Sequence, residues 1–146
     1  MSTDPARVLV VAHRTAAAPP LLDAVRRRAQ QSPALFTLLV PKTVHGLARV
    51  LDPEDVSSEE AEAVLELALP LLEEATGTEV GGMIGAADPM AAVEDAVNIH
   101  GFDEIILSTL PTRVSRLMHI DLPRKIAGLG LPVTTVTAHA RERAPV

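Results

Sequence analysis

The chain has 146 residues, contains no cysteine and carries a formal net charge of −6 at neutral pH. That length suits one domain with its own hydrophobic core, so we expect a single domain spanning residues 1–146. The lack of cysteine excludes disulfides, thiol nucleophiles and thiolate metal ligands, and the acidic balance disfavours non-specific binding to nucleic acid.

Aromatic residues are nearly absent, because Phe36 and Phe102 are the only Phe, Tyr or Trp residues in the chain. The core must therefore be built from Leu, Val, Ile and Ala, and no stacking platform for nucleic-acid bases is available. Residues 1–15 hold no apolar segment long enough for a signal peptide, and no apolar run reaches the length of a membrane span. We expect a cytoplasmic protein that binds neither nucleic acid nor membranes.

The first elements follow from two continuous apolar runs. Residues 7–12, RVLVVA, and residues 35–40, LFTLLV, are typical of strands buried on both faces of a parallel sheet. Between them we predict a helix at 19–31, because proline suits the first turn of a helix. The arginines at 26–28 should lie mostly outside its buried stripe. A further short helix is expected near 44–51.

The middle of the chain predicts one long helix at 57–76, with apolar residues recurring on one side. Ser57 and Glu60 have the spacing of a capping box at its start. Pro70 lies inside the pattern and should kink the helix, because it lacks an N–H group and clashes with the preceding turn. Residues 79–84 are predicted to form the third strand.

In the last part of the chain, Asp88 and Pro89 predict the start of a helix that Gly101 ends. We expect the fourth strand at 103–107, a helix capped by Asp121 or a neighbour that reaches about residue 128, and the fifth strand at 132–138. Strands thus alternate with helices five times. This order predicts an α/β fold with a parallel sheet covered by helices on both faces.

Charge is unevenly distributed along the chain. Residues 50–112 contain fifteen Asp or Glu and no Lys or Arg, whereas residues 1–49 and 113–146 are basic. The simplest interpretation is a solvated acidic helix; the alternative is that the acidic helix at 57–76 recruits a protein partner. The fold could also separate the charges into an acidic and a basic face.

Five sequence features in order resemble those of the universal stress protein family. They are the two apolar runs RVLVVA and FTLLV, the stretch GAADPMAAVEDAV from Gly85, the segment FDEIILST at 102–109 with SRL at 115–117, and the last strand after Leu131-Pro132. The resemblance implies a flavodoxin-like, Rossmann-like three-layer sandwich. Its five-stranded parallel sheet would have the order 3-2-1-4-5. It also implies a homodimer formed through the strand at 133–138, whose β-branched residues would suit a pairing edge.

Many members of that family bind ATP with a glycine-rich loop after the fourth strand, of the form Gly-x-x-Gly, nine residues, then Gly-Ser or Gly-Thr. An acidic residue after their first strand usually holds the ribose. This chain departs from the pattern, as Ser108 and Pro111 replace the first two glycines and Ile120-Asp121 replaces the final pair. Ala12-His13 stands at the ribose position.

The loop chemistry leaves two readings open. Pro111 offers no backbone donor, and Asp121 would place a carboxylate at the helix end where phosphates would sit, which opposes ATP binding. Arg113 and Arg116, however, could bind a phosphate or carboxylate, or could equally pair with Asp121 or lie on the surface. The candidate nucleotide- or anion-binding residues are Ala12, His13, Val40, Ser108, Thr109, Arg113, Ser115, Arg116 and Asp121.

Our first hypothesis is thus a non-catalytic stress-response module whose nucleotide loop is altered. The second is a protein that binds ATP, another adenine nucleotide or a small anion through Thr109, Arg113, Ser115 and Arg116. A third, slow ATP hydrolysis, lacks dedicated metal ligands in the sequence. The histidines show no metal-binding spacing and no catalytic motif is present, so we expect no metal and no catalytic residue.

Overall fold

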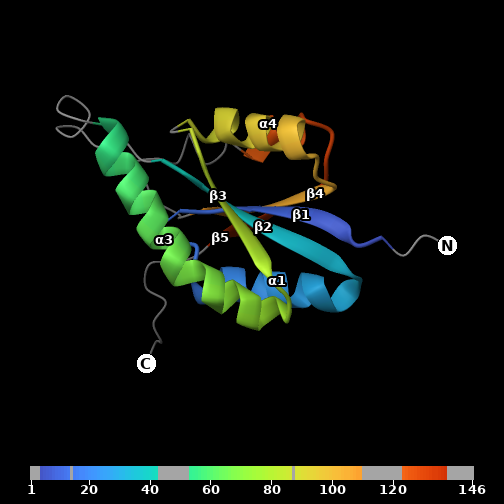
Figure 1. Cartoon of the computed structure of the whole chain (residues 1–146). Helices are drawn as coiled ribbons and strands as arrows, with labels where there is room; N and C mark the ends of the chain where they lie inside the picture. The colour runs from blue at the N-terminus through green and yellow to red at the C-terminus, as the bar shows by residue number, and fades with distance from the viewer. Residues whose placement is uncertain (1–3, 14, 43–52, 87, 110–122, 138–146) are drawn as a thin grey trace.

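A computed structural model of the chain describes residues 4–13, 15–42, 53–86, 88–109 and 123–137. They form one five-stranded sheet in the order β3-β2-β1-β4-β5 (Figure 1). Every neighbouring pair of strands is parallel. The predicted α/β sandwich and its strand order are therefore confirmed.

The strands are β1 (Ala6–Val11), β2 (Ala34–Pro41), β3 (Val80–Gly85), β4 (Glu104–Thr109) and β5 (Val133–Thr137). The helices are α1 (Pro19–Gln31), α3 (Pro53–Thr76) and α4 (Pro89–His100), and residues 123–127 form a short helical segment. All five strands lie within about two residues of their predicted bounds, as expected for boundaries read from sequence. The helix expected at 44–51 lies outside the described residues.

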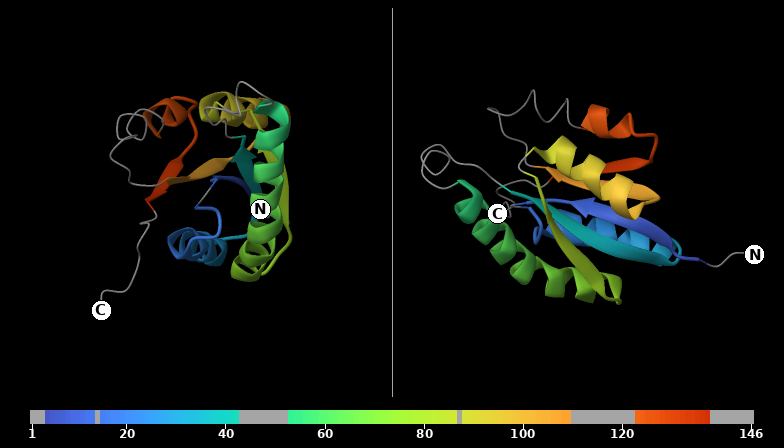
Figure 2. Two further views of the ribbon diagram at one scale, coloured as in Figure 1. Left: turned by 90° about the vertical axis from the view of Figure 1, so that its left-hand side faces the viewer. Right: turned by 45° about the horizontal axis from the view of Figure 1, so that its top comes forward.

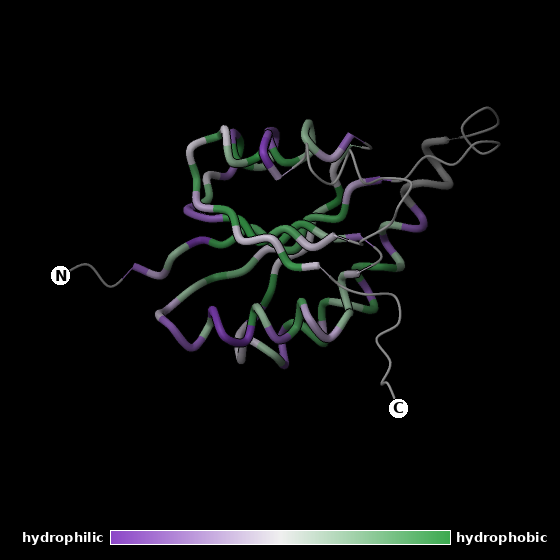
Figure 3. Tube along the Cα trace, turned by 180° about the vertical axis from the view of Figure 1, so that it is seen from behind, coloured by the Kyte–Doolittle hydropathy of each residue, from purple (hydrophilic) through white to green (hydrophobic). Residues whose placement is uncertain are grey.

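Two apolar layers hold the helices to the sheet. Helices α1 and α3 cover one face, and α4 covers the other together with residues 123–127 (Figures 1 and 2). Alternate residues of the central strand β1 pack into the two apolar layers. Val8 and Val10 pack on the side of α1 and α3, and Leu9 and Val11 pack on the side of α4. All four are at most 2% exposed. The hydrophobic centre of Figure 3 follows from this alternation.

The predicted helix ends of α4 and the end of α3 are confirmed. Asp88 caps α4 by accepting a hydrogen bond from the backbone nitrogen of Met90 at 3.3 Å. Gly101 ends α4, and Gly77 follows α3, both with φ of +77°, a conformation that glycine adopts without strain. The backbone nitrogen of Gly77 donates to the Glu73 carbonyl at 2.8 Å, which closes the last turn of α3.

The predicted start of α3 is wrong. The helix begins at Pro53, four residues before Ser57, so the spacing of Ser57 and Glu60 does not mark its start. Proline is favoured in the first turn because the N–H it lacks would have no partner there. Farther along, α3 continues through Pro70 as one helix.

The fourth strand is longer than predicted. Ser108 and Thr109 belong to β4 and are paired in register with Val136 and Thr137 of β5. Sequence reasoning placed both residues in a loop because hydroxyl side chains break the apolar run. The neighbouring strand β5 overrides that local signal by continuing the ladder.

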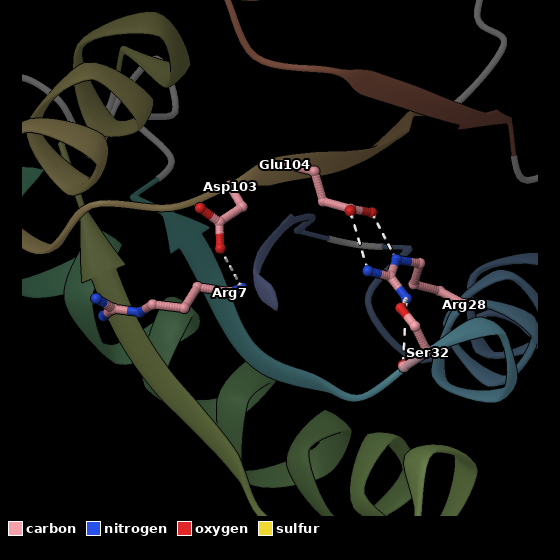
Figure 4. A network of polar contacts seen from close by, with 5 residues as sticks. All are labelled: Arg7, Arg28, Ser32, Asp103 and Glu104. Carbon is pink, nitrogen blue, oxygen red and sulfur yellow. Dashed lines mark hydrogen bonds and ion pairs between the residues drawn. The ribbon is translucent and has the colours of Figure 1, made fainter. Parts of the chain in front are cut away.

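At the opposite end of the sheet, charged side chains tie the first residues of the strands to the helices (Figure 4). Arg28 pairs with both carboxylate oxygens of Glu104, at 2.8 and 3.1 Å, and its side chain is only 13% exposed. The expectation that the arginines at 26–28 lie mostly outside the buried stripe is confirmed for Arg26 and Arg27, which are exposed, and Arg28 is the exception. Asp103 instead accepts a hydrogen bond from the backbone nitrogen of Arg7 at 2.8 Å, so the two adjacent carboxylates serve different partners.

Candidate functional site

The candidate residues belong to the carboxyl edge of the sheet, where the parallel strands end. The neighbours β1 and β4 diverge there, because β1 leads to α1 on one face and the helical segment at 123–127 covers the other. Such a divergence is a topological switch point, and open α/β sheets bind ligands in the crevice beside it. Ligand chemistry is therefore to be sought at the ends of β1, β2 and β4.

A buried pair of hydroxyl groups occupies this switch point. Thr15, in the turn after β1, and Ser108, near the end of β4, form a hydrogen bond with 2.5 Å between their side-chain oxygens. Thr15 is 5% exposed and Ser108 is 7% exposed. The turn is held by a second bond, from the backbone nitrogen of Ala18 to the Thr15 carbonyl at 3.0 Å. The loop after β1 and the strand β4 are thus joined by a side-chain contact inside the protein.

Other predicted residues line the same edge with differing exposure. Ala12 and Val40 are 3% and 0% exposed, and their side chains belong to the core beneath α1 and α3. The backbone nitrogen of Ala12 donates to the Leu39 carbonyl at 3.2 Å, so this donor is already used. His13 and Thr109 are partly exposed, which makes them the more accessible of the described candidates.

The structure brings Ser108 near the end of β1, but it does not describe the remaining candidates. Arg113, Ser115, Arg116 and Asp121 lie outside the described residues, as does Pro111. The proposed contacts of the two arginines therefore stay predictions.

Sequence reasoning missed two residues at this edge. Thr15 carried no signal beyond its position in a turn after a strand. Lys42 directly follows β2 and is only partly exposed; its backbone nitrogen donates to the Gly85 carbonyl at 3.1 Å. Within the described part of the chain its ammonium group has no ion pair. Lys42 thus lies at the carboxyl end of β2, next to the end of β3, and a charged residue directly after an apolar strand was the available signal.

The described residues contain no cluster of side chains suited to bind a metal ion. No group of three or more His, Asp or Glu side chains is gathered there in a way that could hold a metal ion. No helix among those described is long and apolar enough to cross a membrane.

Two hollows open elsewhere on the described surface. One, of about 750 Å³, lies between α1 and β5, with Arg26, Arg27 and Thr134 among its lining residues. The other, of about 640 Å³, lies beside the start of β1 and includes Arg7 and Asp103. Neither hollow includes a candidate residue of the switch point.

Comparison with known proteins places this fold. No protein-family model and no curated protein matches the chain. Among solved structures, it is similar to a universal stress protein from Archaeoglobus fulgidus, with a TM-score of 0.66 and 14% identity over 91% of this chain and 98% of that one. The universal stress protein UspA from Lactobacillus plantarum gives a TM-score of 0.65 and 17% identity over 94% and 99% of the two chains. At these identities the likeness shows a shared fold.

Some of the similar structures hold an adenine nucleotide. A universal stress protein family protein from Arabidopsis thaliana, solved with AMP bound, matches with a TM-score of 0.60 and 15% identity over 93% of this chain and 94% of that one. Others were solved in complex with dAMP and with cAMP. The resemblance inferred from the ordered sequence motifs is therefore borne out at the level of three-dimensional structure.

Proposed function

We propose that this protein is a non-catalytic, cytoplasmic stress-response module with the fold of the universal stress proteins, and that it does not bind ATP in the way usual for that family. The observation that carries the proposal is the buried hydrogen bond between Thr15 and Ser108. A glycine at position 108 would leave room for a phosphate to approach the backbone. Serine fills that place with a hydroxyl that is already bonded, and Pro111 supplies no backbone donor.

Native mass spectrometry of the purified full chain, with and without millimolar ATP and magnesium, tests this proposal. We expect no bound ATP on the wild-type chain. A matched variant, Ser108→Gly with Pro111→Gly, restores the two glycines and should gain ATP binding if the altered loop is what excludes it. Stoichiometric ATP on the wild-type chain would overturn the proposal.

A second candidate function is binding of a nucleoside monophosphate or small anion at the same edge. Lys42 favours it, because this partly exposed lysine at the carboxyl end of β2 has no ion pair among the described residues and carries a positive charge that can bind an anion. The AMP, dAMP and cAMP held by similar structures suggest ligands of this class.

This candidate is tested by titrating the chain with AMP. Arg113→Ala with Arg116→Ala should weaken binding at least tenfold if both guanidinium groups contact the phosphate. The control is Arg26→Ala with Arg27→Ala, which makes the same change in net charge on the exposed side of α1. Equal affinities for the two double variants would remove the arginine site.

For quaternary structure we propose a homodimer formed through β5. This strand lies at the end of the sheet, and three of its five residues, Thr134, Thr135 and Thr137, are exposed without any charge that would discourage pairing. The Pro132 carbonyl accepts from Ile105 in the direction of β4, so the alternation of the backbone turns the N–H of Thr135 away from β4. Thr135→Pro should therefore yield a monomer in light scattering, whereas Thr135→Val should remain dimeric.

A further inference from the structure

Three of the four elements that the acidic part of the sequence forms, α3, β3 and α4, lie together at one end of the sheet, and the fourth, β4, lies between β1 and β5. Residues 50–112 supply α3, β3, α4 and β4, and helices α3 and α4 both pack against β3. The exposed charged side chains described on these two helices are all carboxylates: Glu59, Glu62, Glu66, Glu74, Glu94 and Asp95. Arg26 and Arg27 of α1 and Arg124 and Lys125 lie exposed on other elements. The tertiary structure thus concentrates negative charge around β3.

The outer side of Val80–Gly85, which we call the β3 edge, has no strand beside it among the described residues, because β3 is paired only with β2. In Figure 1 β3 lies at the near end of the sheet, between α3 and α4. The Gly85 carbonyl accepts from Lys42 in the direction of β2. Backbone groups alternate along a strand, so those of Gly82 and Ile84 point outward and have no ladder partner.

Glutamates of α3 accompany this edge. Glu73 accepts a hydrogen bond from the backbone nitrogen of Val80 at 3.2 Å. The face of α3 that carries Glu73 therefore lies next to the start of β3. Glu66 and Glu62 precede Glu73 by seven and eleven residues and share that face. They lie roughly 10 and 16 Å back along the helix, at 1.5 Å per residue. Because the chain reverses between α3 and β3, these two carboxylates flank the later residues of the strand.

The packing of α3 on β3 supports this alignment. A Cβ atom on Gly82 would lie 3.0 Å from a terminal methyl carbon of both Leu65 and Leu69. These leucines neighbour Glu66 on α3, so the helix lies directly over the middle of the strand. Gly82 itself is exposed and carries no side chain, which leaves its outward backbone groups open to close approach.

We propose that the β3 edge binds an extended, lysine- or arginine-bearing peptide segment of another protein, which adds to the sheet as a sixth strand. Main-chain hydrogen bonds to Gly82 and Ile84 would supply the binding, as in other cases of strand addition. Glu62 and Glu66 would select for positive charge on the added strand. A second copy is a poor occupant, because two β3 edges in contact would bring their glutamates together and repel.

The test uses the isotope-labelled full chain and a synthetic peptide of sequence TKVKVKT, blocked at both ends, with TQVQVQT as its uncharged counterpart. Titration followed by NMR should slow hydrogen exchange of the Gly82 and Ile84 amides, since both gain an acceptor. The uncharged peptide should bind at least tenfold more weakly. Raising the salt concentration should weaken the charged peptide alone.

Two double variants of equal net charge show whether peptide binding depends on the glutamates beside the β3 edge or on the overall negative charge of the protein. Glu62→Gln with Glu66→Gln should weaken the charged peptide about fivefold, as expected for the loss of two exposed ion pairs. Glu74→Gln with Glu94→Gln should leave affinity within about twofold, because these residues lie elsewhere on α3 and on α4.

Three outcomes would overturn the proposal. The first is equal binding of the two peptides, and the second is peptide-induced protection confined to residues outside the β3 edge. The third is protection of Gly82 and Ile84 that appears without peptide and grows with protein concentration, because it would identify a second copy as the occupant.

Discussion

Removing one hydroxyl of the Thr15–Ser108 pair should destabilise the protein more than removing both. Ser108→Ala leaves the Thr15 hydroxyl in a site that is 5% exposed, with no other side-chain partner among the described residues. An unsatisfied buried hydroxyl costs about 1–3 kcal/mol. Thr15→Val likewise leaves the hydroxyl of Ser108, which is 7% exposed, without its hydrogen-bond partner. Valine has nearly the same volume as threonine, so the packing should change little.

The double variant removes donor and acceptor together, so the two penalties should not add. We expect a total loss of about 1 kcal/mol, the net worth of an ordinary hydrogen bond. If each single variant loses about 2 kcal/mol, the coupling between the two positions should be about 3 kcal/mol, at the upper end of the range for directly contacting residues. As a control, Thr15→Val combined with Thr134→Val on the exposed face of β5 should be additive.

The assay is urea unfolding followed by far-UV circular dichroism, since the chain has no Trp or Tyr for fluorescence. Free energies from linear extrapolation give the four corners of the cycle, provided that the slopes agree between variants. Additivity within about 0.3 kcal/mol would refute the reasoning. It would show that the two hydroxyls do not depend on each other, and the proposal that the bonded Ser108 hydroxyl keeps ATP out would lose its basis.

Two further predictions concern packing and charge. Gly85→Ala should destabilise by about 1–3 kcal/mol, because the new Cβ would lie 2.6 Å from that of Ala92 and 2.9 Å from a methyl carbon of Leu39; Ala92→Gly in the same chain should recover part of the loss in urea unfolding. Glu104→Gln should cost about 2 kcal/mol by weakening the pair with Arg28. Adding Arg28→Met should reduce that cost, and an unchanged cost would contradict the role of the pair.

Local signals in the sequence were enough for most of the fold. The apolar runs at 7–12 and 35–40 became the adjacent strands β1 and β2, since a strand buried on both faces admits few polar residues. Asp88 and Gly101 marked the ends of α4 because their caps depend on the backbone of the same few residues. Strand order came from the family resemblance together with the alternation of strands and helices.

The errors arose where distant parts of the chain decide the outcome. Ser108 and Thr109 looked like loop residues, yet β5 pairs with them and extends β4. Arg28 looked like a surface residue of α1, yet it forms a partly buried ion pair with Glu104, which is 76 positions away. Helical periodicity says which side of α1 is apolar, but it carries no information on which charge lies opposite.

The candidate site divides along the same line. The sequence alone predicted a parallel sheet, whose strands all end at the same edge, and it showed that the segment after the fourth strand lacks the glycines of the family it resembles. Only the tertiary structure decided that Thr15 meets Ser108, 93 positions away, and that Glu73 of α3 accepts a hydrogen bond from the first residue of β3. The physical reason is that hydrophobic patterning specifies faces and directions, whereas contacts between polar side chains depend on the register and packing that arise once the chain has folded.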